Sequence, residues 1–230
     1  MDRTLRSRLA EVDARIDDAA RASGRDPGEI TRIVVTKFHP AALVDDLYRL
    51  GVRDVGENRQ QELTTKSAEL SARADLRWHF IGQAQTNKAR AVRAAASVVH
   101  TVDRERLADA LEAAATPGAP VLDVLVQVNL TDDPARGGVA PERIESLAAH
   151  VAEGCGTLRL RGIMAVAPLG EEPAAAFDRL RGYAERVRTV VPDAHWISAG
   201  MTGDFVEAIR AGATHLRIGS AITGPRPGHG

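Results

Sequence analysis

Short apolar runs separated by helical patterns recur along almost the whole chain, and this alternation is the feature that most constrains its fold. Eight runs have the β-branched and apolar character of strands: RIVVTK, VRDVGEN, RWHFIG, SVVHTV, VLDVLVQVN, LRLRGIMAV, HWISAG and THLRIG. Several are apolar on both faces, which is typical of strands in a parallel sheet that is covered by helices. The alternation therefore predicts a parallel α/β architecture.

Helical spacing fills the segments between these runs and also precedes the first of them. Residues 1–23 predict an amphipathic helix, with apolar side chains at three- and four-residue intervals at Leu5, Leu9, Val12 and Ile16. Residues 103–115 predict a second helix, for which Asp103 is the expected N-cap, and residues 141–152 predict a third that begins at Pro141. The order strand, loop, helix and loop is thus repeated along the chain.

Length and strand number choose between the parallel folds. The chain has 230 residues, which suits one (β/α)8 barrel, although two small domains would also fit. An open doubly wound sheet is the alternative, but no G-x-G-x-x-G pattern follows the first strand, and such sheets usually have only about six strands. We expect one domain over residues 1–230, an α/β TIM barrel with an extra N-terminal helix and a flexible tail at residues 225–230.

Composition excludes several classes of partner. Thirty Lys and Arg against 31 Asp and Glu give a formal net charge of -1, so we expect neither nucleic acid nor an anionic membrane as the main partner. The first residues lack the apolar run of a signal peptide, and no stretch is long and apolar enough to span a bilayer. These features favour a cytoplasmic protein.

The single cysteine, Cys155, rules out an intramolecular disulfide. Because Gly154 and Gly156 flank it, we expect it in a loop, and no histidine stands at a metal-ligand spacing from it. A reducing compartment and no metal site are therefore expected.

A lysine stands where the first strand ends. In a barrel, functional side chains gather at the carboxyl ends of the strands, and Val35-Thr36-Lys37 delivers an amine there. A lysine at this place can be a surface charge, or it can form a Schiff base, because a partly desolvated ammonium readily loses its proton. The residue type alone leaves both interpretations open.

Small-residue turns follow the last two strands. Gly219 and Ser220 precede a short helix after the eighth strand, and Ser198-Ala199-Gly200-Met201-Thr202 follows the seventh. Such turns let backbone N–H groups approach an anion, and barrels often bind phosphate in these two loops. Each turn is a weak signal alone, but together with Lys37 they favour a phosphate-bearing ligand with a reactive carbonyl.

Eight segments resemble, in order, the signatures of the pyridoxal 5'-phosphate (PLP) homeostasis protein family: VVTKFHP, GENRQQE, WHFIGQAQTNKAR, HTVDRERLADAL, VQVNLTDDPARGGV, LRGIMAVAP, WISAGMTGDFVEAI and GATHLRIGSAITGPR. The resemblance covers nearly the whole chain, and the GEN, WHFIG and RIGSAI segments are distinctive together. Members of that family are similar to the N-terminal barrel domain of alanine racemase and bind PLP without an established turnover. The resemblance therefore implies PLP as the cofactor.

Carried over residue by residue, the resemblance implies a PLP site that includes Lys37 as the residue holding the cofactor as a Schiff base. It implies that the phosphate is held by Ser198, Gly200, Gly219 and Ser220. It also implies that Arg217 points at the pyridine nitrogen and that Asn58 and Met201 line the ring. A guanidinium can only donate, so the ring nitrogen beside it would stay unprotonated and the cofactor would be a weak electron sink.

The chain departs from the family pattern in several places. Arg59 replaces the common Tyr after GEN, Gln83-Ala84 replaces Pro-Leu after WHFIG, and Arg136 replaces a lysine, so no aldimine can form at that position. A lone histidine in an apolar strand, His79, is more often a core residue than a functional one. The large aromatic residues are also expected in the core, namely Trp78, Phe80 and Trp196.

Three functions remain open at this stage. The leading hypothesis is a monomeric PLP carrier or buffer that serves PLP-dependent apoenzymes and takes part in the homeostasis of PLP, amino acids and keto acids. It is expected not to be an enzyme, although a single lysine allows a weak racemase-like side activity. An amino-acid racemase is the alternative, but the second base of such enzymes is a tyrosine from a C-terminal domain, and Tyr48 and Tyr183 lie in helical patterns. A vestigial PLP site on an interaction protein is the third, and the intact Lys37 argues against it.

Overall fold

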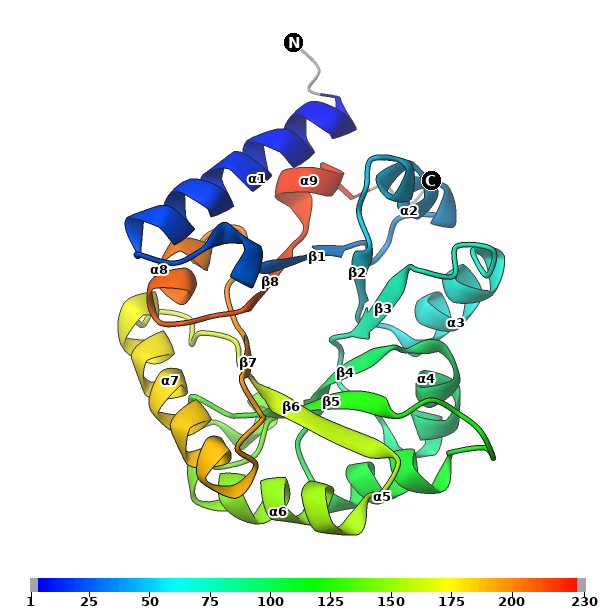
Figure 1. Cartoon of the computed structure of the whole chain (residues 1–230), viewed down its shortest axis with the longest axis vertical. Helices are drawn as coiled ribbons and strands as arrows, with labels where there is room; N and C mark the ends of the chain where they lie inside the picture. Colours follow the sequence, from blue (N-terminus) through cyan, green and yellow to red (C-terminus); the bar gives the residue numbers. More distant parts are fainter. Residues whose placement is uncertain (1–3, 227–230) are drawn as a thin grey trace.

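The chain folds into a closed barrel of parallel strands surrounded by helices (Figure 1). The computed structural model describes residues 4–226, and residues 1–3 and 227–230 lie outside the described part. The strands follow sequence order around the barrel, from β1 to β8 and back to β1. Their bounds are β1 (Thr31–Val35), β2 (Asp54–Glu57), β3 (Arg77–Phe80), β4 (Val98–Val102), β5 (Leu122–Gln127), β6 (Leu158–Met164), β7 (Trp196–Ser198) and β8 (His215–Ile218). All eight predicted strands and the TIM-barrel fold are confirmed.

Helices alternate with the strands on the outside of the barrel. They are α1 (Leu5–Ala22), α2 (Ala41–Arg49), α3 (Gln60–Glu69), α4 (Ala89–Ala95), α5 (Glu105–Ala113), α6 (Ile144–Gly154), α7 (Pro173–Val190), α8 (Phe205–Arg210) and α9 (Ser220–Thr223). Short 3-10 turns precede or interrupt them at η1 (Pro27–Glu29), η2 (Thr86–Lys88), η3 (Pro134–Arg136) and η4 (Pro141–Arg143). The extra N-terminal helix is confirmed over Leu5–Ala22. Of the tail expected at residues 225–230, the last four residues lie outside the described part.

Two helix starts differ from their predictions. The helix expected to begin at Pro141 begins at Ile144, because Pro141–Arg143 forms the 3-10 turn η4. The second difference is at α5. The expected cap, Asp103, does not cap α5, which begins at Glu105 with Arg104 in the N-cap position. The Asp103 carboxylate instead accepts a hydrogen bond from the Arg104 guanidinium at 2.5 Å. Asp103 thus stands one residue before the N-cap position, from which the side chain of a capping residue would accept from the first helical amides.

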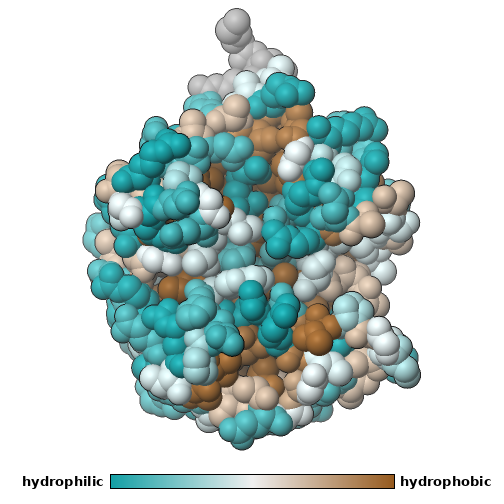
Figure 2. All heavy atoms as spheres, viewed as in Figure 1, coloured by the Kyte–Doolittle hydropathy of each residue, from teal (hydrophilic) through white to brown (hydrophobic). Residues whose placement is uncertain are grey.

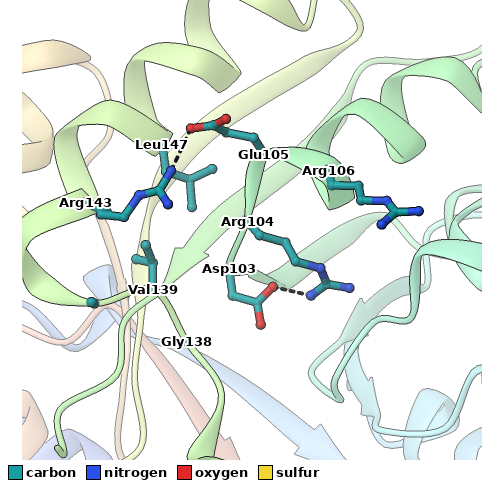
Figure 3. Close-up of a pocket in the computed structure, with 9 residues that line it drawn as sticks. Asp103, Arg104, Glu105, Arg106, Gly138, Val139, Arg143 and Leu147 are labelled. Carbon is teal, nitrogen blue, oxygen red and sulfur yellow. Dashed lines mark hydrogen bonds and ion pairs between the residues drawn. The ribbon is translucent and has the colours of Figure 1, made fainter. Parts of the chain in front are cut away.

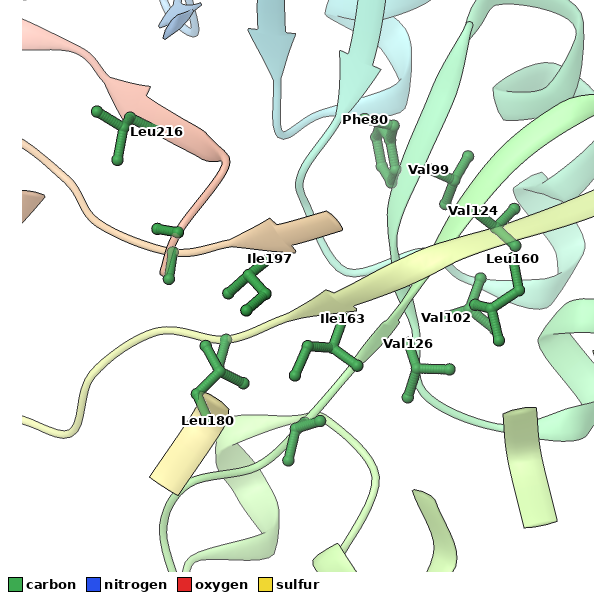
Figure 4. Packing of buried hydrophobic residues seen from close by; sticks show 14 of the residues in the cluster. Phe80, Val99, Val102, Val124, Val126, Leu160, Ile163, Leu180, Ile197 and Leu216 are labelled. Carbon is green, nitrogen blue, oxygen red and sulfur yellow. The ribbon is translucent and has the colours of Figure 1, made fainter. Parts of the chain in front are cut away.

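The continuous apolar core lies between the strands and the helices. Figure 4 shows aliphatic side chains of this cluster from successive strands, such as Val99, Val124 and Ile163, and Leu180 of α7 belongs to the same cluster. Phe80 is fully buried in this cluster, and Trp78 is also buried, so the prediction that both are core residues is confirmed. The low aromatic content explains why this layer is mostly aliphatic.

The barrel interior is unusually polar. Val98, Leu125 and Met164 form a small apolar cluster separate from the main core, against which Trp196 packs. The remaining interior volume holds buried polar side chains from several strands, among them His79, His100, Ser198, His215 and Arg217. TIM-barrel interiors are normally filled by branched aliphatic residues, so these side chains need another reason to be there.

Barrel closure brings the two ends of the chain together. Ile33 of β1 pairs with Arg217 of β8, and Val34 pairs with Ile218. Helix α1 runs outside this seam and packs against α8 and α9 (Figure 1). The Arg8 guanidinium donates to the carbonyl oxygen of Ile222 at 2.7 Å, which ties α1 to the last helix.

The outer surface is mostly hydrophilic. On the face drawn in Figure 2, apolar residues appear as separate patches between charged and polar side chains. No helix in the described part of the chain is long and apolar enough to cross a membrane.

Candidate functional site

A cavity of about 340 Å³ lies at the carboxyl ends of β1 and β8, beside the loop that leads into α8. It is lined by Val35, Lys37, His39, Ile81, Met201, Thr202, Gly203, Arg217, Gly219, Ser220, Thr223, Gly224 and Arg226. Five of the eight sequence-predicted site residues are in this lining: Lys37, Met201, Arg217, Gly219 and Ser220. This is the end of a barrel at which binding sites form.

Lys37 reaches the cavity from a tight turn after β1. The next residue, Phe38, has a left-handed backbone with φ of 68°, which is uncommon for a residue with a side chain. Its backbone N–H donates to a carboxylate oxygen of Glu62 at 2.7 Å. Among residues 4–226, the Lys37 ammonium forms no ion pair, so its amine is available to a ligand in the cavity.

The buried Lys66 is hydrogen-bonded to the backbone of the turn that carries Lys37. The Lys66 ammonium donates to the carbonyl oxygen of Thr36 at 3.0 Å, to Glu57 at 2.7 Å and to Glu62 at 3.0 Å. Burial raises the pKa of Glu57, although Lys66 and the Thr36 hydroxyl oppose this. Burial would also raise the pKa of Glu62, but the bonds from Phe38 and Lys66 bring it below its usual value. The carboxylates of the buried Glu57 and the partly buried Glu62 therefore share the Lys66 ammonium as their counter-charge.

Arg217 is anchored in the wall of the cavity by two hydrogen bonds. One terminal nitrogen donates to Ser198 Oγ and the other to the carbonyl oxygen of Ala165, both at 2.8 Å. Burial lowers the pKa of Arg217 to about 10, and the nearby Asp204 opposes the change. The guanidinium therefore remains a cation at neutral pH and acts only as a donor.

Two residues that the resemblance assigned to the phosphate stand behind Arg217. Ser198 is fully buried and is absent from the cavity lining, and its hydroxyl is held by Arg217 and His100. Gly200 is also absent from the lining, and its carbonyl oxygen accepts from the Arg217 N–H at 2.9 Å. A Cβ on Gly200 would lie 2.7 Å from that of Ala208, so glycine is required for packing. This geometry makes both residues supports of Arg217.

The turn from β8 into α9 presents backbone donors to the cavity. Gly219 is the N-cap of α9, and the exposed Ser220 is its first residue. The first N–H groups of any helix have no partner within the helix, so those of Ser220 and Ala221 are free to bind an acceptor. Together with the Ser220 hydroxyl they form a small set of donors close to Lys37 and Arg217.

Asn58 lies in a neighbouring cavity. That cavity, of about 390 Å³, is lined by Arg59, Gln83 and Lys88 among others, and Asn58 does not line the cavity of Lys37. Its side-chain oxygen is buried without a hydrogen-bond partner among the described residues. The expectation that Asn58 lines the same space as Met201 finds no support in this arrangement.

Several lining residues were not identified from the sequence. His39 and Ile81 come from the loops after β1 and β3, Thr202 and Gly203 from the turn before α8, and Arg226 from the end of the described chain. Thr202 lies within the turn that the sequence singled out, so the turn was the available signal. Arg226 stacks over the Phe38 ring, with its guanidinium carbon 4.5 Å from the ring centre, a contact that no local pattern reveals.

Another cavity of about 370 Å³ lies between α5 and the loop before α6 (Figure 3). Three of its nine lining residues are arginines, of which Arg104 is paired with Asp103 and Arg143 with Glu105. These ion pairs compete with any anion that enters. We therefore place the candidate site at Lys37.

The surroundings of Cys155 differ from the expectation. The thiol is buried at the end of α6, and ligand atoms of Asp109, His150 and Cys155 all lie within 4.8 Å of one another. Cys155 is the C-cap of α6, not a residue of a separate loop, and His150 of the same helix lies near it although the sequence shows no metal-ligand spacing between them. Burial raises the pKa of the thiol to about 11, and the His150 ring is already paired with Asp109 at 2.6 Å. The group is not part of the cavity lining.

The chain is similar to known proteins over nearly its full length. The model of the alanine racemase N-terminal domain matches residues 10–227. The pyridoxal phosphate homeostasis proteins of Mycobacterium tuberculosis and Pseudomonas aeruginosa are each 42% identical, covering 95% and 97% of this chain and 91% and 96% of their own lengths.

Solved structures give the same result. PipY of Synechococcus elongatus, determined with PLP bound, is 31% identical and superposes with a TM-score of 0.83, covering 95% of this chain and 99% of PipY. Alanine racemase from Corynebacterium glutamicum, at 14% identity and a TM-score of 0.69, shares the fold over 96% of this chain and 63% of its own. The chain therefore belongs to the pyridoxal phosphate homeostasis protein family, built on the alanine racemase N-terminal domain.

Proposed function

We propose that this chain binds PLP reversibly and attaches it covalently to Lys37, acting as a carrier or buffer of the cofactor. The observation that carries the proposal is that the Lys37 amine, the Arg217 guanidinium and the start of α9 line one cavity. The relatives named for pyridoxal phosphate homeostasis, and PipY with PLP bound, support it. When bound, PLP supplies an aldehyde that condenses with a lysine amine.

The lysine content of the chain sharpens this proposal. The sequence has three lysines, Lys37, Lys66 and Lys88. Lys66 is buried and donates to two carboxylates and a carbonyl, so its amine is already used. Lys88 is exposed and lines the other cavity, with Asn58. Lys37 is therefore the amine best placed for covalent attachment.

We place the phosphate against the first turn of α9. Ser220 and the N–H groups that open this helix supply donors, and the neighbouring turn at Thr202 and Gly203 borders the same space. Gly219 lies beside Val35, whose carbonyl oxygen would be 3.8 Å from a Cβ at this position. In this arrangement Ser198 and Gly200 act through Arg217 and do not touch the phosphate.

Arg217 would face the ring nitrogen of the cofactor. It is a permanent donor at neutral pH, so a pyridine nitrogen beside it stays unprotonated and withdraws little charge from bonds made at the aldehyde carbon. Met201, which is 40% exposed, would cover the ring. These features suit storage of PLP better than carbanion chemistry.

We propose binding without efficient turnover. The racemase alternative needs a second base opposite Lys37, yet Tyr48 lies on α2 and donates to Asp75, and Tyr183 lies on α7. Neither tyrosine lines the cavity. PLP-dependent apoenzymes are the recipients that such a carrier would serve, and we propose that it acts as a monomer in the cytoplasm. On the face drawn in Figure 2 the apolar residues form separate patches, which supports the monomer.

The test is to add PLP, reduce the complex with borohydride and map the modified lysine by peptide mass spectrometry. We expect the added mass on Lys37, its loss in Lys37→Met, and an unchanged result in the control Lys88→Met. Modification of Lys66 or Lys88 in the unaltered protein, with Lys37 unmodified, would overturn the proposal.

A further inference from the structure

A continuous chain of hydrogen bonds crosses the polar barrel interior. Asp54 on β2 accepts from His79 on β3 at 2.8 Å, and His79 bonds to His100 on β4 at 2.9 Å. His100 bonds to Ser198 on β7 at 2.9 Å, and Ser198 accepts from Arg217 on β8 at 2.8 Å. Five strands thus contribute one residue each to a path that runs from the amino end of β2 to the cavity.

The two ends of this chain fix the direction of every bond in it. A carboxylate only accepts, so His79 must carry its proton on Nε2 and, when neutral, accept at Nδ1 from Nε2–H of His100. His100 then accepts at Nδ1 from the Ser198 hydroxyl, whose oxygen accepts from Arg217. Every donor therefore points from the cation of Arg217 toward the carboxylate of Asp54.

Burial keeps the two histidines neutral. Both rings are at most 1% exposed, and burial lowers the pKa of His79 and, more strongly, that of His100. Burial would raise the pKa of Asp54, but bonds from His79 and Arg77 bring it below its usual value, so it remains a carboxylate. With both histidines neutral, every hydrogen bond between Asp54 and Arg217 has a donor and an acceptor in only one arrangement of the protons.

We propose that Asp54, His79 and His100 are positioning residues of the PLP site, which hold the Arg217 guanidinium in one orientation through Ser198. The inference rests on the proposed function insofar as Arg217 faces the cofactor. An aliphatic interior would pack the barrel equally well, whereas this polar path gives Ser198 a proton acceptor and so leaves its oxygen free to accept from Arg217.

A third buried histidine provides a matched control. His215 lies in the same cluster, with its ring centre 6.4 Å from those of His79 and of His100. Its Nδ1 bonds to Thr214 Oγ1 at 2.8 Å, and its ring packs on Trp196. It contributes to the core but stands outside the chain of bonds.

The first test needs no substitution and no PLP. Two-bond proton–nitrogen NMR correlations of the histidine rings in the unligated protein report which nitrogen carries the proton. We expect His79 and His100 both in the Nε2–H form at neutral pH. A proton on Nδ1 of either ring, or a charged ring, would overturn the inference whether or not PLP binds.

The second test compares His100→Leu and Asp54→Asn with the control His215→Gln. We expect His100→Leu to weaken PLP binding by about tenfold, equivalent to about 1.4 kcal/mol, and to change the absorbance spectrum of the bound cofactor. For Asp54→Asn we expect a mixture of His79 ring forms by NMR and the same spectral change, and for the control an unaltered spectrum. Equal effects in all three variants would show that the histidines only pack the core. Absence of PLP binding to Lys37 in the unaltered protein would instead refute the proposed function and leave the NMR test standing.

Discussion

The Lys66 ammonium lies 3.0 Å from the carbonyl oxygen of Thr36, so a buried lysine on α3 fixes the backbone that carries Lys37. The same ammonium pairs with Glu57 and Glu62, and Glu62 in turn holds the Phe38 N–H. The turn after β1 is thereby tied to β2 and α3 by bonds that involve no ligand.

Replacement of Lys66 by methionine should therefore destabilise the protein. The change leaves the buried Glu57 and the partly buried Glu62 without their counter-charge, which typically costs about 3 to 5 kcal/mol. We expect a corresponding fall in the free energy of unfolding in urea and weaker PLP binding. Lys88→Met, at an exposed position, should change the free energy of unfolding by less than about 0.5 kcal/mol. Equal stability of the two variants would contradict the role given to Lys66.

Replacement of Ser220 by alanine should separate the phosphate from the rest of the ligand. If the hydroxyl donates to the phosphate, its loss removes a charge-assisted bond worth about 1.5 to 3 kcal/mol, or about tenfold or more in affinity. Pyridoxal has no phosphate, so its binding should be almost unaffected. Titration of both ligands by absorbance checks this, and equal losses would place the phosphate elsewhere.

Incubation with L- or D-alanine should give no racemisation above that of free PLP. Lys37 is positioned on one side of the cavity, and neither Tyr48 nor Tyr183 reaches it, so only one face of a bound amino acid would meet a base. A chiral assay in deuterated water separates the outcomes. Slow deuterium uptake with retained configuration agrees with a single base, whereas inversion at about 1 per second or faster would make the protein an enzyme.

Acid should destabilise the barrel through its buried histidines. Burial lowers the pKa of His215 from 6.5 to about 3, so between these values the unfolded chain binds a proton that the folded chain does not. Stability is therefore complete above pH 6.5 and falls as the pH drops, by about 1.4 kcal/mol per pH unit for this residue. Urea unfolding over this range should show a shallower pH dependence in His215→Gln, and identical slopes would contradict the prediction.

Replacement by alanine should lower the stability of the protein at Gly162 and raise it at Gly182. A Cβ on Gly162 of β6 would lie 1.8 Å from the Trp196 carbonyl oxygen, so Gly162→Ala should cost about 3 kcal/mol or prevent folding. Gly182 lies inside α7 with no atom within 4 Å of its added Cβ, so Gly182→Ala should raise stability by about 0.5 to 1 kcal/mol. Thermal unfolding monitored by circular dichroism measures both, and a stable Gly162→Ala variant would show that the strands can move apart.

The sequence predicted those parts of the site that neighbouring residues in the chain define. Apolar runs ending in Lys37 and in the Gly219-Ser220 turn identify strand ends, and a closed parallel barrel places such ends on one rim. The fold, Lys37 and the Gly219-Ser220 turn follow from that rule, whereas the roles of Arg217 and Met201 were implied by the family resemblance. His79 is 1% exposed and does not line the cavity, so its burial agrees with the sequence pattern, whereas its place in the hydrogen-bond path was not foreseen.

Contacts across the barrel could not be predicted in the same way. The bond between His79 and His100 depends on the stagger of neighbouring strands, which a single sequence does not encode in any local pattern. The same is true of Lys66, which looks like a surface lysine of an amphipathic helix but is buried under Thr36. Lys37 and Ser198 both come at the ends of apolar runs. Only the three-dimensional structure shows that Lys37 lines the cavity and that Ser198 does not.

The pairing of β1 with β8 also determines when, during synthesis, the cavity that contains Lys37 can form. Lys37 is near the start of the chain and Ser220 near its end, and they share a cavity only because the last strand pairs with the first. During synthesis Lys37 leaves the ribosome long before β8 exists, so an emerging polypeptide carries this lysine without Ser220 or Arg217 beside it. At the proposed site PLP would then bind only after β8 has paired with β1. Truncated chains that lack β8 would therefore not withdraw PLP from the cell.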